Sequence, residues 1–217
     1  TSNSLKEYID FIKEAKAVVK IPVIASINCV SASQWVTFAS RIQEAGADAI
    51  EINVFLLPTD AKKSANELEE IYYTLASKLT GLVSIPVSFK LGAHFTNPLN
   101  IIEQLYARKV KGVVLFNRFF EPDFDIENLK VIPAPIFSNA ADIRNTLRWV
   151  GMTSHLVPKV DVSASTGVHD GESLIKMILA GASSVQVCST IYKNGAGQIA
   201  TMLKTLSTWM DHKGYKK

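Results

Sequence analysis

The sequence predicts an α/β protein in which parallel strands alternate with helices, and a repeated two-part pattern carries this prediction. The first part places proline just ahead of an apolar run, as in Ile21-Pro22-Val23 and Ile85-Pro86-Val87, with the variant Val157-Pro158-Lys159. The second part places glycine just ahead of a short apolar run. It occurs three times, and its glycines, Gly46, Gly112 and Gly181, are 66 and 69 residues apart. Each interval is about twice the roughly 30-residue length of a strand–helix–strand step.

Each part of the pattern suits the start of a buried strand. Proline can begin a strand because its missing N–H group matters least at the first position. Glycine can end the preceding helix because it adopts the left-handed conformation of a C-terminal cap. The apolar runs that follow are short enough for strands of a parallel sheet. We expect six strands, which begin near Val23, Ala49, Val87, Val113, Lys159 and Ser184.

The segments between these runs have apolar residues at helical spacing. Asn97-Pro98 is an expected helix start because asparagine caps a helix N-terminus and proline suits the first helical position. Asp170 is a second expected cap. The expected helices cover residues 1–20, 32–45, 64–79, 98–109, 140–150, 171–180 and 196–212.

Six strand–helix units leave two architectures open. A closed (β/α)₈ barrel needs eight units and typically ~250 residues, whereas this chain has 217. The units therefore form either a barrel that lacks two units or an open, doubly wound sheet. We favour the barrel, because no strand precedes the helix expected at the start of the chain. On this interpretation residues 1–217 are a single domain, the C-terminal six units of a TIM (β/α)₈ barrel whose first two units are absent from the chain.

Composition and charge exclude several classes of protein. Apolar residues make up 47% of the chain and charged residues 20%, which is typical of a globular domain. The net charge of +3 is too small for an electrostatic nucleic-acid surface. No apolar run approaches the ~18 residues that a membrane span needs, and the histidines and cysteines lack the spacing of a metal site. We expect a cytoplasmic protein that acts on a small molecule, without nucleic-acid, membrane or metal partners.

Polar residues stand at four of the expected strand ends, where a parallel βα barrel carries its active site. Asn28, Asn53 and Asn117 supply amides, and Lys90 supplies one cation. A single asparagine at such a position is commonly a turn former. The set of four is more typical of a site that binds a hydrogen-bonding, partly anionic ring.

The last two expected loops indicate a phosphate site. Ser165-Thr166-Gly167 follows a strand, and a helix begins at Asp170. Backbone N–H groups of a glycine-containing turn beside a helix N-terminus favour a phosphate. Cys188-Ser189-Thr190 ends the next strand with further N–H groups and hydroxyls. Barrels often bind phosphate in the loops after strands 7 and 8, although many α/β turns contain the same residue types.

Taken in order, these residues resemble the dihydroorotate dehydrogenase family. The resemblance extends from about Ile21 to Ile191 and is most specific in its closing segment. Members of this family are FMN-containing (β/α)₈ barrels of pyrimidine synthesis, so the resemblance implies that the chain covers strands three to eight of such a barrel. The matching segments are Ile21-Pro22-Val23-Ile24-Ala25-Ser26-Ile27-Asn28, Glu51-Ile52-Asn53, the strand of Lys90, Asn117, Thr166-Gly167-Val168 and Leu179-Ala180-Gly181-Ala182-Ser183-Ser184-Val185-Gln186-Val187.

The resemblance implies a role for each matching residue. Asn28 and Asn53 would hydrogen-bond the flavin ring, and Asn53 would also reach the substrate. Lys90 would stand near the electron-rich edge of the flavin and stabilise the charge gained on reduction. Asn117 would bind the pyrimidine or its carboxylate. The FMN phosphate would be held by Ser165, Thr166, Gly167, Cys188 and Ser189, with Ser138 a weaker candidate.

The reaction that the resemblance implies is oxidation of dihydroorotate to orotate in UMP biosynthesis, or of a related dihydropyrimidine to its unsaturated form. It removes a proton from one substrate carbon and passes a hydride from the neighbouring carbon to flavin N5. The general base of the family is the Cys or Ser of a Ser-Cys-Pro-Asn or Ser-Ser-Pro-Asn phrase. Leu56 or Leu57 takes that place in this chain, and an alkyl side chain cannot accept a proton.

Other residues are candidates to replace the base. Thr59, Asp60 and Ser64 lie farther along the same loop and would serve only if the loop folds back. Cys29 follows a strand end, although a small, half-buried residue is its more ordinary role. In the phosphate loops Thr166-Gly167 replaces the usual Gly-Gly, and Cys188-Ser189 replaces Gly-Thr. Backbone donors survive both changes, so flavin binding is less affected than proton abstraction.

Two alternatives stay open beside the dehydrogenase. A flavin barrel of the same family without the base would act on another substrate, and a non-catalytic barrel would only bind a phosphate or a nucleotide. Large apolar residues in Phe55-Leu56-Leu57 and Phe119-Phe120 fit a dry lid, a homodimer contact or packing against the missing units. Arg118 fits either a substrate carboxylate or a solvated strand end.

Overall fold

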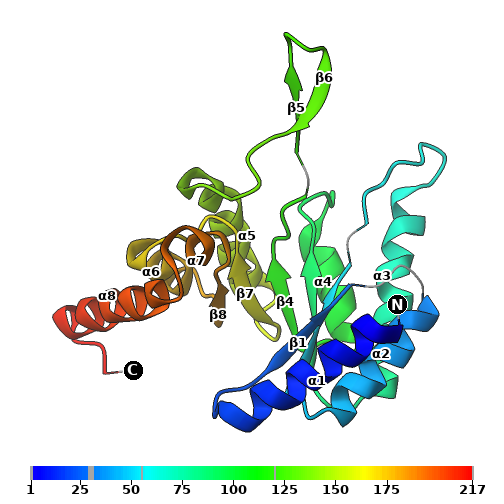
Figure 1. Cartoon of the computed structure of the whole chain (residues 1–217), viewed down its shortest axis with the longest axis horizontal. Helices are drawn as coiled ribbons and strands as arrows, with labels where there is room; N and C mark the ends of the chain where they lie inside the picture. Colours follow the sequence, from blue (N-terminus) through cyan, green and yellow to red (C-terminus); the bar gives the residue numbers. More distant parts are fainter. Residues whose placement is uncertain (1, 29–31, 55, 120, 217) are drawn as a thin grey trace. The chain divides into compact units, whose positions relative to one another are not determined.

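The structure is a computed structural model that describes residues 2–28, 32–54, 56–119 and 121–216 (Figure 1). The chain forms two compact units, Thr1–Val114 and Leu115–Lys217. Within each unit, strands that pair in parallel alternate with helices along the chain.

The first unit is built on strands in the order β1-β2-β3-β4. β1 pairs in parallel with β2, and β2 in parallel with β3. The interior residues of β2 and β3, such as Ile50, Ile52 and Phe89, are completely buried, as expected for strands that are covered on both faces. The elements of this unit are α1 (Ser2–Val18), β1 (Ile24–Ile27), α2 (Ala32–Glu44), β2 (Ala49–Asn53), α3 (Ala65–Leu82), β3 (Val87–Leu91), α4 (Pro98–Ala107) and β4 (Gly112–Leu115), whose last residue opens the second unit.

Two predicted helix signals of the first unit are confirmed, whereas α1, α3 and α4 end two or three residues away from the predicted positions. The Asn97 side chain accepts a hydrogen bond from the Asn100 amide at 3.2 Å, and Pro98 is the first helical residue. Gly46 follows α2 with a φ of +90°, the left-handed conformation that glycine adopts without strain. The strands of this unit begin within one residue of the predicted starts.

The second unit combines a parallel strand pair with an antiparallel hairpin. β7 pairs in parallel with β8, so that Ser163 stands opposite Ser184, and β5 pairs antiparallel with β6. The Asp170 side chain accepts a hydrogen bond from the Ser173 amide at 2.8 Å, which confirms the predicted cap. The elements are β5 (Pro122–Asp125), β6 (Lys130–Pro133), the 3₁₀ turn η1 (Ala140–Asp142), α5 (Ile143–Leu156), β7 (Asp161–Ser165), α6 (Gly171–Leu179), β8 (Ser184–Gln186), α7 (Ser189–Asn194) and α8 (Gly197–Lys213).

Three parts of the second unit differ from the prediction, and one of them is α7, which begins at Ser189 where a loop was expected. The β5–β6 hairpin, green in Figure 1, lies in a segment expected to be an irregular connection. Its strands have only four residues each and carry Pro122 at one end and Pro133 at the other, and proline in so short a run argues against a strand. The helix expected over residues 140–150 begins as a 3₁₀ turn and continues to Leu156, because Gly151 does not interrupt its hydrogen bonds.

The α/β class is confirmed, and the alternation of parallel strands and helices fits part of a (β/α)₈ barrel. The absence of the first two units stays a prediction. Among the described residues, no helix combines the length and the apolar character needed to cross a membrane.

Candidate functional site

Three of the predicted ring-binding residues meet at one edge of the first unit. Asn53 is the last residue of β2 and is the register partner of Lys90 in β3. Asn28 directly follows Ile27, which is the register partner of Ile52. Since side chains alternate between the faces of a sheet, Asn53 and Lys90 point to the same face. The register of the three strands therefore produces the cluster of two amides and one cation that the sequence predicts.

A second row of polar residues, to which the sequence analysis assigns no role, lies two residues earlier on each strand and on the same face of the sheet. Ser26, Glu51 and Ser88 are register partners on β1, β2 and β3. The Ser26 hydroxyl donates a hydrogen bond to Glu51 Oε1 at 3.0 Å, and the carboxylate is only 6% exposed. Buried carboxylates need such donors because desolvation penalises their charge. The signal in the sequence is the alternation of Glu51 and Asn53 with isoleucines in an otherwise apolar strand.

The loop after β2 contains the predicted substitute bases, and two of them, Asp60 and Ser64, make hydrogen bonds within the loop and to the start of α3. The Ser64 hydroxyl accepts a hydrogen bond from the Glu67 amide at 3.3 Å and donates one to Glu67 Oε2 at 2.8 Å. This capping box starts α3. Asp60 Oδ1 accepts from the Lys62 amide at 3.0 Å, and Thr59 is exposed. Catalytic roles for these residues stay predictions, and Cys29 lies outside the described residues.

The predicted phosphate turn of the second unit has a left-handed backbone at two successive residues. Thr166 has a φ of 82° and Gly167 a φ of 81°. A Cβ atom at Gly167 would lie 2.2 Å from the Ile143 nitrogen at the start of α5, so the turn requires glycine there. Thr166 tolerates this unusual conformation while its hydroxyl donates a hydrogen bond to the Phe116 carbonyl at 3.0 Å. The turn therefore packs closely against α5 and has a left-handed backbone at both residues.

Ser138 joins three segments beside this turn. Its amide donates a hydrogen bond to Ser189 Oγ at 3.1 Å, and its hydroxyl lies 3.0 Å from His169 Nε2. Lys193 Nζ donates to the Ser138 carbonyl at 2.9 Å. The structure thus brings together two predicted phosphate residues, Ser138 and Ser189, and adds a histidine and a lysine. Lys193 has no signal in the sequence apart from its spacing of one helical turn from Ser189.

Lys193 is the more effective cation of this group. Burial lowers the pKa of His169, and the neighbouring Lys193 ammonium lowers the pKa further. Asp170 and Asp142 act in the opposite direction but are weaker. The imidazole therefore favours its neutral form, and Lys193 carries the positive charge next to the turn.

The remaining predicted residues of this unit differ in their surroundings. Ser165 is buried, and its carbonyl accepts hydrogen bonds from the Thr146 hydroxyl at 3.0 Å and the Phe116 amide at 3.2 Å. Cys188 precedes α7 as an exposed free thiol, and its side chain makes no cap hydrogen bond. Asn117 follows β4 and is half-buried. Their roles toward a ligand stay predictions.

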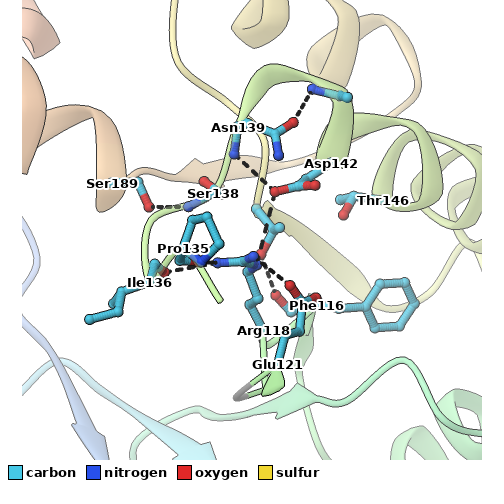
Figure 2. A network of polar contacts seen from close by, with 12 residues as sticks. Phe116, Arg118, Glu121, Pro135, Ile136, Ser138, Asn139, Asp142, Thr146 and Ser189 are labelled. Carbon is cyan, nitrogen blue, oxygen red and sulfur yellow. Dashed lines mark hydrogen bonds and ion pairs between the residues drawn. The ribbon is translucent and has the colours of Figure 1, made fainter. Parts of the chain in front are cut away.

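Arg118 is held by the protein itself (Figure 2). Its Nη1 donates to the carbonyls of Pro135 and Ile136 at 2.7 and 2.8 Å, and its Nη2 pairs with Glu121 Oε2 at 2.6 Å. Its Nε lies 3.9 Å from Asp142 Oδ2. Because the guanidinium already has these partners, it ties the segment after β4 to the chain ahead of α5. This favours a structural role for Arg118 over binding of a substrate carboxylate.

Each unit, taken by itself, has residues that fit one part of a flavin nucleotide. The first unit offers amides and an ammonium group for a ring that gains negative charge on reduction. The second offers the left-handed backbone of the Thr166-Gly167 turn, together with Lys193 and hydroxyls, for a phosphate. Within the described residues, no group of histidine, cysteine and carboxylate side chains is arranged to hold a metal ion.

Known proteins of one family are similar to this chain over most of its length. The family model described as dihydroorotate dehydrogenase matches residues 2–210. The catalytic subunit of dihydroorotate dehydrogenase B (NAD(+)) from Thermoplasma volcanium is 27% identical over 97% of this chain and 69% of its own length. Dihydroorotate dehydrogenase A (fumarate) from Lactococcus lactis subsp. lactis is 24% identical over 96% of the chain and 71% of its own length.

A third relative, the dihydroorotate dehydrogenase B (NAD(+)) catalytic subunit of Thermoplasma acidophilum, is 26% identical over 88% of this chain and 64% of its own length. The chain thus spans about two thirds of the length of these relatives. The family match covers both clusters, from Asn28 to Lys193. The chain belongs to the dihydroorotate dehydrogenase family.

Proposed function

We propose that this protein is an FMN-dependent oxidoreductase that oxidises dihydroorotate, or a related dihydropyrimidine, at its CH–CH bond. The observation that carries the proposal is the pairing of Asn53 with Lys90 at the ends of β2 and β3. This pair places an amide and a cation side by side where the family resemblance puts the flavin ring. Relatives named as dihydroorotate dehydrogenases support the substrate.

The chain's own residues would bind and orient the reactants. Asn28 and Asn53 would hydrogen-bond the ring, and the Lys90 ammonium would stabilise negative charge on it. FMN, when bound, would accept the hydride. Gly167, Ser138, Ser189 and Lys193 would hold its phosphate through backbone amides, hydroxyls and one ammonium group.

A second candidate, a flavin enzyme of the same family with a different substrate, is favoured by the loop after β2. Leu56 or Leu57 stands at the position where the dihydroorotate dehydrogenase family carries its general base. The Ser64 hydroxyl already donates a hydrogen bond to Glu67. Removal of a carbon-bound proton by a positioned group contributes about 10²–10⁴-fold to rate. A substrate with a more acidic C–H bond would need that group less.

An anaerobic absorbance titration of the full chain, purified without added flavin, separates these candidates. Bound flavin that bleaches on addition of dihydroorotate supports the proposed reaction. Bound flavin that stays oxidised overturns dihydroorotate as the substrate and supports the second candidate. No flavin after reconstitution overturns both and favours a barrel that only binds a phosphate or nucleotide.

The variant Lys90→Met tests the role of the cation in the same experiment. We expect it to fold normally but to bind flavin with a lower reduction potential, because the reduced ring loses a stabilising charge. Lys78→Met, which removes an exposed lysine of α3, is the matched control. Equal potentials in the two variants would contradict the placement of Lys90 beside the ring.

A further inference from the structure

A small cavity opens in the first unit beside the ends of β2 and β3. Its volume is about 70 Å³. The walls come from the loop after β2, from α3 and from the loop after β3. The apolar and small wall residues are Leu56, Pro58, Leu68, Tyr72, Gly92 and Phe95.

The wall of this cavity is predominantly apolar and uncharged. The rings of Tyr72 and Phe95 meet edge to face, with 5.3 Å between centroids and 76° between planes. Tyr72 is only 3% exposed, and burial raises its pKa to about 12. The phenol therefore remains protonated at neutral pH. Three polar residues, Glu69, His94 and Thr96, also line the cavity, and the Glu69 carboxylate would repel an anionic group that entered.

One wall residue connects the cavity with the missing base. Leu56 is a candidate for the place of the family's base, and its half-buried side chain lines the cavity. The same change of residue that removes a proton acceptor therefore adds an apolar surface. An alkyl side chain at that position is suited to contact an apolar group and not to deprotonate a carbon.

The cavity lies within reach of a ligand at Asn53 and Lys90. Gly92 is two residues after Lys90, and Leu56 is three residues after Asn53. Two residues of extended chain span at most about 7 Å and three at most about 11 Å. Two residues of the cavity wall therefore lie at most about 11 Å along the chain from Asn53 or Lys90, which is the separation that one bound molecule would have to span.

We infer that this cavity receives a compact apolar substituent of the substrate, which is then a more apolar CH–CH donor than dihydroorotate, as in the second candidate function above. On the scale at which a cavity of about 150 Å³ holds one benzene molecule, 70 Å³ suits roughly three carbon atoms. The carboxylate of dihydroorotate does not match this surface. The part of the inference that concerns a substrate rests on the flavin function proposed above.

The test is an NMR titration of the full chain, labelled with ¹³C at the leucine methyl groups, with isobutanol as the probe. The methyl signals of Leu56 and Leu68 are assigned from their replacement by isoleucine. We expect both signals to shift and to saturate at a dissociation constant on the order of millimolar, as fits a very small ligand. The exposed Leu203 serves as an internal reference and should not saturate.

Two variants decide whether the shift reports the cavity. Ala65→Phe fills it from the exposed first residue of α3 and should abolish saturation. Ala107→Phe adds the same ring at the exposed last residue of α4, away from the cavity, and should leave the titration unchanged. A linear shift in all three proteins, or saturation that survives Ala65→Phe, would overturn the inference.

The flavin absorbance of the same samples keeps the two proposals distinguishable. Flavin without a saturable leucine shift overturns the cavity and leaves the flavin function. A saturable shift without flavin, even after reconstitution, overturns the flavin function and with it the substrate, while the cavity remains a binding site for an apolar group.

Discussion

The loop after β2 and the turn after β7 both depart from the family pattern, and the two departures have opposite consequences. In the turn, Thr166 replaces a glycine, yet the left-handed backbone is kept and Gly167 still contacts α5. In the loop, a leucine replaces a proton acceptor, and nothing in the backbone can restore the lost chemistry. A function performed by main-chain groups tolerates a change of side chain, whereas a function performed by one side chain does not.

The largest effect is expected at Gly167 in the turn. Gly167→Ala places a Cβ atom 2.2 Å from the Ile143 nitrogen and should lower the free energy of unfolding by about 3 kcal/mol or more, measured by urea denaturation. Gly214→Ala is the control, because Gly214 also has a positive φ of 75° but open space around it. We expect a loss of about 1 kcal/mol there. Similar losses at both positions would show that the close contact with α5 is unimportant.

Two substitutions at Thr166 separate the effect of the backbone conformation on stability from the effect of the side-chain hydrogen bond. Thr166→Val keeps the unusual φ of 82° but removes the hydroxyl that donates to the Phe116 carbonyl, and should destabilise by about 1–2 kcal/mol. Thr166→Gly loses the same bond but relieves the backbone, so its effect should be near zero. Thermal unfolding compares the two variants, and equal losses would contradict the proposed balance.

Ser64 offers the corresponding test in the loop after β2. Ser64→Ala removes the cap of α3 and should cost about 1 kcal/mol of stability. Ser64→Asn should retain most of that stability, because asparagine is also a good cap but its amide cannot act as a general base. If the serine only caps the helix, substrate-dependent reduction of flavin should proceed at the same rate in Ser64→Asn as in the wild type. A rate that falls by 10²-fold or more would identify Ser64 as the base.

The smallest effect is a pH dependence at His169. Its pKa is lowered in the folded protein, so below a pH of about 6.5 the unfolded chain binds the proton more readily. Protonation of His169 therefore does not affect stability at neutral pH. The free energy of unfolding falls as the pH drops from about 6.5 toward the lower pKa of the folded protein. His169→Gln should remove part of the difference in stability measured between pH 7.5 and pH 5.5. Asp170, whose pKa is also lowered, acts only at a lower pH, because its stabilising effect is lost as the pH falls below its usual value near 3.8.

The sequence by itself determined the six parallel strands, most of the helices and one of the two clusters. Glycine, proline and helix-capping residues act over three or four positions, so Asn97 and Asp170 begin helices as predicted. Asn53 and Lys90 meet because parallel strands of similar length end at one edge of their sheet. Both inferences use only local spacing, which the sequence displays directly.

Only the tertiary structure decided contacts between distant segments. Lys193 reaches Ser138 over 55 positions, and Arg118 is held by carbonyls 17 and 18 residues away. The cavity beside Leu56 needs α3 and the loop after β3 to close its walls. The sequence does not reveal such contacts because they depend on how whole elements pack, which the spacing of residues within one element leaves undetermined.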